Sequence, residues 1–235
     1  MNITSSVLRL ITALTFGFVL AGCQTAPPTI QTGPEAEQSF DGLNVVDNSR
    51  ADLAWARPDF NLDGYTKIWP VGAGIEYRPV KNRGKSTMDR SRGGPYFIDD
   101  KARGKFEKLV GETFKEELQK IERFEVVDGP GPDVLMVRGA LLDVTSMVPP
   151  DLTSARSTIY LRNIGDATLV LELRDSETGT ILARSADRRA AESIGDTFRQ
   201  ANSVTTAVEV KRLIRYWASR LREGLDGFAQ DSSSD

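Results

Sequence analysis

The sequence contains no histidine and only one cysteine, Cys23. Without histidine the chain cannot build a Ser-His-Asp triad or a Cys-His pair, and it lacks the commonest ligand for zinc, copper and non-haem iron. With one cysteine it cannot form an intramolecular disulfide, a Cys-x-x-Cys redox pair or a thiolate zinc cluster. Much of known enzyme chemistry is therefore excluded, and stability must come from packing.

The N-terminus carries the apolar run Leu10 to Leu20 behind a single positive charge, Arg9. A helix needs roughly 20 apolar residues to span a bilayer, so this run is too short, whereas it suits the core of a signal peptide. We therefore expect residues 1–22 to be an export signal that is removed.

The run ends in Leu20-Ala21-Gly22-Cys23, which resembles the lipobox of bacterial lipoproteins. That resemblance implies cleavage after Gly22 and lipidation at Cys23, whose acyl chains anchor the protein at about 0.8 kcal/mol per buried CH₂. The alternative is an ordinary secretory signal with an incidental cysteine. Because Gln24 replaces the aspartate that favours inner-membrane retention, we expect an outer-membrane lipid anchor, with the domain facing the periplasm.

The composition is that of one globular domain: 235 residues, 40% hydrophobic and 27% charged. Thirty basic and 33 acidic side chains give a net charge of −3, which argues against a nucleic-acid partner. Residues 23–39 are rich in Thr, Pro and Gly and predict a flexible tether behind the lipidated cysteine. We expect a single periplasmic α/β domain at 40–230 and a disordered tail at 231–235.

Hydrophobic periodicity predicts two amphipathic helices, one from after Pro95 to about Ile121 and one from about Ser203 to Phe228. Strands are predicted at 65–71, continuing or pairing with 74–80, and at 124–127, 133–148, 167–174 and 180–188, the last two joined by a hairpin turn. The fold class is an α/β (α+β) two-layer sandwich, in which the two helices pack on a mixed sheet of about four or five strands. The strand-helix-strand unit 65–127 is expected to cross over right-handedly.

The segment 78–92 is strongly basic. Against one acid, Asp89, it carries Arg78, Lys81, Arg83, Lys85, Arg90 and Arg92. Such a loop could contact the phosphates of anionic lipid or lipopolysaccharide, each charge contributing about 1 kcal/mol at an anionic surface. The alternative is a solvated surface loop, which the absence of interleaved aromatic residues favours.

No nucleotide-binding motif is present, because Gly72-Ala73-Gly74 lacks a third glycine and Gly84-Lys85-Ser86 lacks the earlier glycine of a phosphate loop. Four carboxylates could be imagined as a glycosidase pair: Asp143, Glu172, Asp175 and Asp187. Nothing in their spacing selects two of them, so we predict no catalytic residue, no cofactor and no metal.

Several turn and strand segments resemble a family of Gram-negative lipoproteins classed only as a domain of unknown function. They are Phe40-Asp41-Gly42-Leu43, Asp63-Gly64-Tyr65, Gly129-Pro130-Gly131-Pro132-Asp133-Val134-Leu135 with Leu142-Asp143-Val144, and the stretch Glu172 to Gly179. The resemblance implies family and location and transfers no catalytic residue.

Two functional hypotheses follow. The first is a non-catalytic interaction or accessory module, anchored through Cys23, that binds an envelope protein or glycan. The second is a hydrolase or transferase that acts on envelope glycans through carboxylates. An exposed apolar patch or sheet edge would favour the first, and an acid-lined cleft would favour the second.

Overall fold

The computed structural model describes residues 26–80, 94–149, 160–192, 198–200 and 203–231. One sheet contains β1 (Thr29–Ile30), β2 (Asn44–Asp47), β3 (Leu53–Ala56), β4 (Lys67–Tyr77), β5 (Glu125–Val126), β6 (Val134–Val144), β8 (Asn163–Asp175) and β9 (Ile181–Glu192). A separate pair is formed by β7 (Tyr160–Leu161) and β10 (Arg199–Gln200). The helices among the described residues are α2 (Asp100–Leu118) and α3 (Ser203–Asp231).

The sheet runs in the order β1-β2-β3-β9-β8-β6-β4-β5. Its centre is antiparallel, with β8 between β9 and β6, whereas β4 lies parallel to both β6 and β5. The sheet is therefore mixed, as predicted, and the chain returns through α2 to a parallel neighbour. A strand as rich in apolar residues as β6 belongs in the interior of a sheet, and it lies there between β4 and β8.

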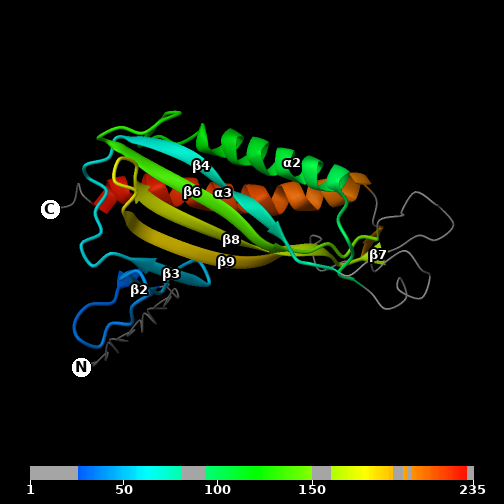
Figure 1. Cartoon of the computed structure of the whole chain (residues 1–235), viewed down its shortest axis with the longest axis horizontal. Coiled ribbons are helices and arrows are strands. Elements are labelled where there is room, and N and C mark those ends of the chain that lie inside the picture. The colour runs from blue at the N-terminus through cyan, green and yellow to red at the C-terminus, as the bar shows by residue number, and fades with distance from the viewer. Residues whose placement is uncertain (1–25, 81–93, 150–159, 193–197, 201–202, 232–235) are drawn as a thin grey trace, which may run out of the picture.

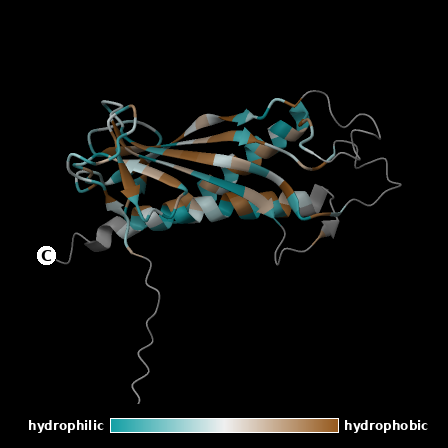
Figure 2. Ribbon diagram, turned by 90° about the horizontal axis from the view of Figure 1, so that it is seen from below, coloured by the Kyte–Doolittle hydropathy of each residue, from teal (hydrophilic) through white to brown (hydrophobic). Residues whose placement is uncertain are grey.

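Helices α2 and α3 lie side by side over one face of the sheet (Figure 1). The view at right angles shows the strands as one layer and α3 as the other (Figure 2). The core between them has two clusters. One surrounds Ile68, Leu135 and Leu118, and the other surrounds Leu141, Ile214 and Trp217. The predicted combination of two helices with a mixed sheet is confirmed, and the opposite face of the sheet has no helix over it among the described residues.

The strand count was underestimated, because the sheet has eight strands rather than four or five. The unpredicted strands β1, β2 and β3 contain two to four residues each. Such short strands are too brief to show a two-residue hydrophobic period. Their stability comes from pairing, since β3 aligns four residues against β9 and Trp55 lies opposite Arg184.

Part of the expected tether is paired into this sheet edge. Thr29 and Ile30 lie opposite Asp47 and Val46, and the Gln31 amide donates to the Val45 carbonyl at 2.9 Å. A composition poor in apolar residues argued for a tether, but backbone hydrogen bonds to β2 place residues 29–31 in the sheet. At the other end, Asp231 is the last residue of α3 rather than the start of a tail, and 232–235 lie outside the described residues.

The helices match their predicted positions with shifted ends. Helix α2 begins at Asp100 because the Asp99 carboxylate accepts a hydrogen bond from the Ala102 amide at 2.7 Å, which is the geometry of an N-cap. Strand β4 joins the two segments predicted at 65–71 and 74–80 into one strand with register shifts near Ile75. In the β8–β9 turn, Gly179 has a φ of +69°, a conformation that favours glycine.

Candidate functional site

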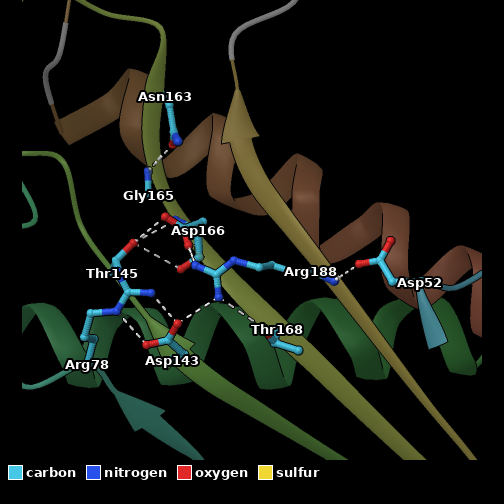
Figure 3. A network of polar contacts seen from close by, with 9 residues as sticks. All are labelled: Asp52, Arg78, Asp143, Thr145, Asn163, Gly165, Asp166, Thr168 and Arg188. Carbon is cyan, nitrogen blue, oxygen red and sulfur yellow. Dashed lines mark hydrogen bonds and ion pairs between the residues drawn. The ribbon is translucent and has the colours of Figure 1, made fainter.

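Asp143 is the first of the four carboxylates that the sequence singles out. It stands near the end of β6 with a φ of +55°, where β6 and β4 slip out of regular register. Its carboxylate accepts hydrogen bonds from Arg78 Nε at 2.6 Å and from Arg188 at 2.8 Å. Asp143 is therefore clamped between two guanidinium groups from the neighbouring segments (Figure 3).

The network continues to a second carboxylate. Arg188 also binds Asp166, whose other oxygen accepts from the Thr145 hydroxyl at 2.7 Å. Figure 3 shows these side chains bridging β6, β8 and β9, with the Arg188 amide held by the Asp52 carboxylate at 2.7 Å. Positive and negative side chains alternate along the network. Their attraction links β6, β8 and β9 to one another and to the segment that follows β4.

These contacts decide what Asp143 can do. The hydrogen bond from Arg78, together with that from Arg188, lowers the pKa of Asp143 to about 2 against the opposing effect of burial. A carboxylic acid that protonates a glycosidic oxygen needs a raised pKa. Asp143 is instead fixed as a carboxylate, which suits cross-linking of strands.

Glu172 and Asp175 are held in the same way. Burial alone would raise the pKa of Glu172, but hydrogen bonds from Arg174 at 2.9 Å and Arg184 at 3.1 Å outweigh it and leave the pKa lowered. Hydrogen bonds from the Thr178 hydroxyl and amide lower the pKa of Asp175, which closes the β8–β9 turn. Both carboxylates have structural partners.

Asp187 lies on the opposite side of the sheet from Glu172. Its carboxylate accepts a hydrogen bond from Trp217 Nε1 on α3 at 2.7 Å, so it faces the helices. Glu172 alternates with Leu171 and Leu173, which face α3, and therefore points to the uncovered face. Glu172 and Asp187 therefore do not form an acid pair of the kind that a glycosidase uses.

The other predicted sites fall largely outside the described residues. Of the basic loop 78–92, Arg78 is described and is committed to Asp143, while Lys81, Arg83, Lys85, Asp89, Arg90 and Arg92 lie outside. Cys23 also lies outside, so lipidation there stays a prediction.

The structure contains a feature that the sequence did not predict, an apolar groove beside α3. The groove has a volume of about 410 Å³, within the range of about 300–1,000 Å³ typical of ligand sites. It lies between α3 and the part of the sheet formed by β8, β9 and β3. Its apolar lining includes Ile30, Val46, Trp55, Phe60, Leu171, Leu173 and Leu221.

The groove exists because the sheet is wider than its helical cover. Helix α3 packs over β8 and β9, while β3, β2 and β1 extend the sheet beyond it. Leu171 and Leu173 point toward the helix layer yet remain half-buried, unlike Leu169 in the core. The unpredicted strands therefore form one wall of the groove, and Tyr216, Leu221 and Gly224 of α3 form the other.

One end of the groove carries cationic side chains. The turn that contains Arg50 is held beside β9, because the Asp52 carboxylate binds the Arg188 amide next to Asp187. Asp187 in turn binds Trp217, which places this turn level with the Tyr216 and Trp217 end of the groove. The Arg220 guanidinium lies 5.5 Å from the centre of the Tyr216 ring, so both arginines mark the same end.

Sequence reasoning missed this site because its lining comes from segments spread between residues 28 and 225. The available signal was weak: Ile30, Val46 and Trp55 are apolar residues in a region without strand or helix periodicity. No pattern in the sequence indicates that Ile30 and Val46 face α3 across a gap.

Two further observations concern the described part of the chain. It contains no cluster of three or more Cys, Asp or Glu side chains able to hold a metal ion. Neither of its helices combines the length and apolarity needed to cross a bilayer.

Comparison with solved structures finds weak similarities. Protein XCC0632 from Xanthomonas campestris, of the DUF330 family, is 12% identical and covers 77% of this chain and 94% of its own, with a TM-score of 0.41. A neuraminyllactose-binding hemagglutinin homologue from Helicobacter pylori is 9% identical over 72% and 91%, with a TM-score of 0.36. PelC from Paraburkholderia phytofirmans, a dodecamer, is 12% identical over 68% and 89%, with a TM-score of 0.32. These scores are too low to transfer any role.

The search among curated proteins gives no match to the chain. A family model, by contrast, matches residues 37–221, which span β2 through most of α3. The match confirms the resemblance to a domain of unknown function. The chain belongs to DUF3313, a family of proteins of unknown function.

Proposed function

We propose that this protein is a membrane-anchored, non-catalytic binding module of the bacterial cell envelope. The observation that carries the proposal is the apolar groove beside α3, a half-open surface of the kind that binds apolar groups of ligands or partners. Acylated Cys23 would anchor the domain at the outer membrane, facing the periplasm, and the groove would bind an envelope component there.

The carboxylate hypothesis has less support. Asp143, Glu172 and Asp175 all have lowered pKa values because neighbouring groups donate hydrogen bonds to them. Glycoside hydrolysis by a carboxylate pair needs one member protonated near neutral pH. These three residues therefore do not supply the acid. The geometry supports a binding role better than a catalytic one.

Anchoring is tested by replacing Cys23. The Cys23→Ser chain is expected to leave the membrane fraction, while mass spectrometry of the wild-type N-terminal peptide finds an acylated cysteine. An unmodified Cys23 in envelope-localised protein would contradict anchoring.

Binding through the groove is tested by photo-crosslinking in cells. A crosslinking amino acid at Ala54, which lines the groove, is compared with one at Leu142, which lies on the uncovered face of the sheet beside Thr168. The Ala54 probe is expected to capture a specific adduct that the Leu142 probe does not. Identical adducts, or none, from both positions would contradict a binding role for the groove.

A further inference from the structure

We propose that the groove beside α3 binds one acyl chain of an anionic lipid, with the lipid head group held at the end marked by Arg50 and Arg220. This inference rests on the proposed function and names the chemical class of its ligand. It is argued from the groove's lining, its size, its charge and the place where the chain leaves the sheet.

The apolar lining of the groove favours a hydrocarbon as the ligand. Val46, Leu171, Leu173 and Leu221 are all half-buried along the groove, so their apolar surface is only partly covered by the protein itself. A linear hydrocarbon chain in the groove would remove this apolar surface from water, and the surface of the chain itself would leave water as well. A volume of about 410 Å³ is near the lower end of the usual range for ligand sites, so it fits a single acyl chain rather than a whole lipid.

The positive charge at one end of the groove favours a ligand with an anionic head group. Within the described residues, neither Arg50 nor Arg220 forms an ion pair, although other arginines on the sheet are bound to carboxylates. Two acids near this end already have partners: Asp187 binds Trp217 and Arg189, and Asp52 binds the Arg188 amide. Two exposed guanidinium groups at the end of an apolar groove complement an amphiphile whose polar end carries a phosphate.

The expected lipid anchor at Cys23 lies close to the groove in the sequence, which favours a membrane lipid as the ligand. Thr29 pairs with Asp47, and the Asn48 side chain donates to the Pro27 carbonyl at 3.4 Å, so the chain enters β1 beside the turn that holds Arg50. Pro28 itself lines the groove and lies five residues after Cys23, a span of at most about 18 Å. Acylation of Cys23 would therefore keep the cationic end of the groove within reach of the head groups.

The experiment titrates the full chain, purified from membranes in detergent, with phosphatidylglycerol or with phosphatidylcholine carrying the same acyl chains, and follows binding by native mass spectrometry. We expect one phosphatidylglycerol to bind per chain. Arg50→Glu and Arg220→Glu should each weaken phosphatidylglycerol binding about fivefold or more, while phosphatidylcholine binding changes little.

The groove itself is blocked by Gly224→Phe. A Cβ at Gly224 meets no atom within 4 Å, so the ring can enter the groove without a backbone clash, and a non-glycine residue favours the helix. Gly227→Phe is the matched control, because Gly227 is on the same helix, is equally unobstructed and lies outside the groove lining. Gly224→Phe should lose binding of both lipids at an unchanged melting temperature, and Gly227→Phe should retain it.

Four results would overturn the inference. Lipid binding by Gly224→Phe equal to that of the wild type would locate the lipid elsewhere. Binding of added lipid by Cys23→Ser but not by the acylated chain would show that the groove holds the protein's own anchor. If no lipid binds but the Ala54 probe captures a specific protein in cells, the lipid inference is refuted and the proposed binding module stands. If no lipid binds and the Ala54 probe captures nothing, the lipid inference and the proposed function are both refuted.

Discussion

Trp217 Nε1 on α3 donates a hydrogen bond to the Asp187 carboxylate on β9, at 2.7 Å. Trp217 is 3% exposed and Asp187 is 7% exposed, so both groups have left bulk water. Arg189 Nε donates to the same Asp187 oxygen at 2.7 Å and balances its charge. This buried polar contact fixes α3 against β9 where the groove begins.

Removing the acceptor should destabilise the protein. Asp187→Ala leaves the buried indole N–H without a partner and deprives Arg189 of its counterion, which should lower the free energy of unfolding by about 2–3 kcal/mol. Asp187→Asn keeps an oxygen for Trp217 and should cost clearly less. Urea unfolding followed by tryptophan fluorescence measures both, and equal losses for the two variants would show that the hydrogen bond to Trp217 contributes little.

The network around Asp143 should make stability depend on acid. Because Arg78 and then Arg188 lower the pKa of Asp143 from 3.8 to about 2, the folded state favours the carboxylate. The resulting stabilisation is complete above the unfolded value of 3.8 and is lost as the pH falls through about 2. Because the side chain is 39% exposed, solvent screening limits this contribution to about 1 kcal/mol.

Asp143→Asn isolates that contribution. At neutral pH the variant should unfold about 1 kcal/mol more easily than the wild type, and the difference should shrink as the pH falls below 3.8 toward 2. Urea titrations across this range measure the difference. A gap that stays constant with pH would attribute the effect to packing rather than to ionisation of Asp143.

The elements that could be predicted from sequence are those with long, regular patterns. Helix α3 shows a stripe that includes Ile214, Trp217 and Leu225, and all three are buried in the core. Strand β6 is apolar at most of its positions, and the β8–β9 hairpin carries Gly179 at its positive-φ turn position. In these segments local pattern and tertiary environment agree, so periodicity was sufficient.

The candidate site was not predictable for the opposite reason. Strands β1 and β3 have two and four residues, and they are ordered by partners that lie far along the chain. Ala54 pairs with Ser185, a contact between residues more than a hundred positions apart that no local signal encodes. The groove depends on how far the sheet extends past α3, which is a property of the assembled fold. The carboxylates, although visible in the sequence, could be assigned structural roles only once their arginine partners were known.

Arg184 should prove essential for holding the N-terminal segment. Its guanidinium binds both oxygens of Asp41, at 3.2 and 2.6 Å, while its Nε binds Glu172 at 3.1 Å. Arg184→Lys keeps the charge but cannot make this two-sided contact, so it should cost about 1–2 kcal/mol. Hydrogen exchange should accelerate at residues 39–45, where the Leu43 carbonyl accepts from the Ser39 amide.

Arg174→Lys provides the control for Arg184. Arg174 also binds Glu172, at 2.9 Å, but its other contact is the Gly179 carbonyl rather than the N-terminal segment. Its replacement should leave exchange at residues 39–45 unchanged. Faster exchange there in both variants would mean that Glu172, and not the contact with Asp41, orders the segment.

Gly165 should tolerate no side chain. A Cβ at this position in β8 would lie 2.2 Å from the Thr145 carbonyl oxygen, which is backbone and cannot rotate away. Gly165→Ala therefore forces β8 and the residues after β6 apart, disturbing the Thr145 contacts with Asp166, and should lower the free energy of unfolding by about 2–3 kcal/mol. Gly139→Ala in β6 is the matched control, since its Cβ would meet Leu171 at an ordinary 3.5 Å and should change stability little. Similar melting temperatures for the two variants would contradict the close backbone approach at Gly165.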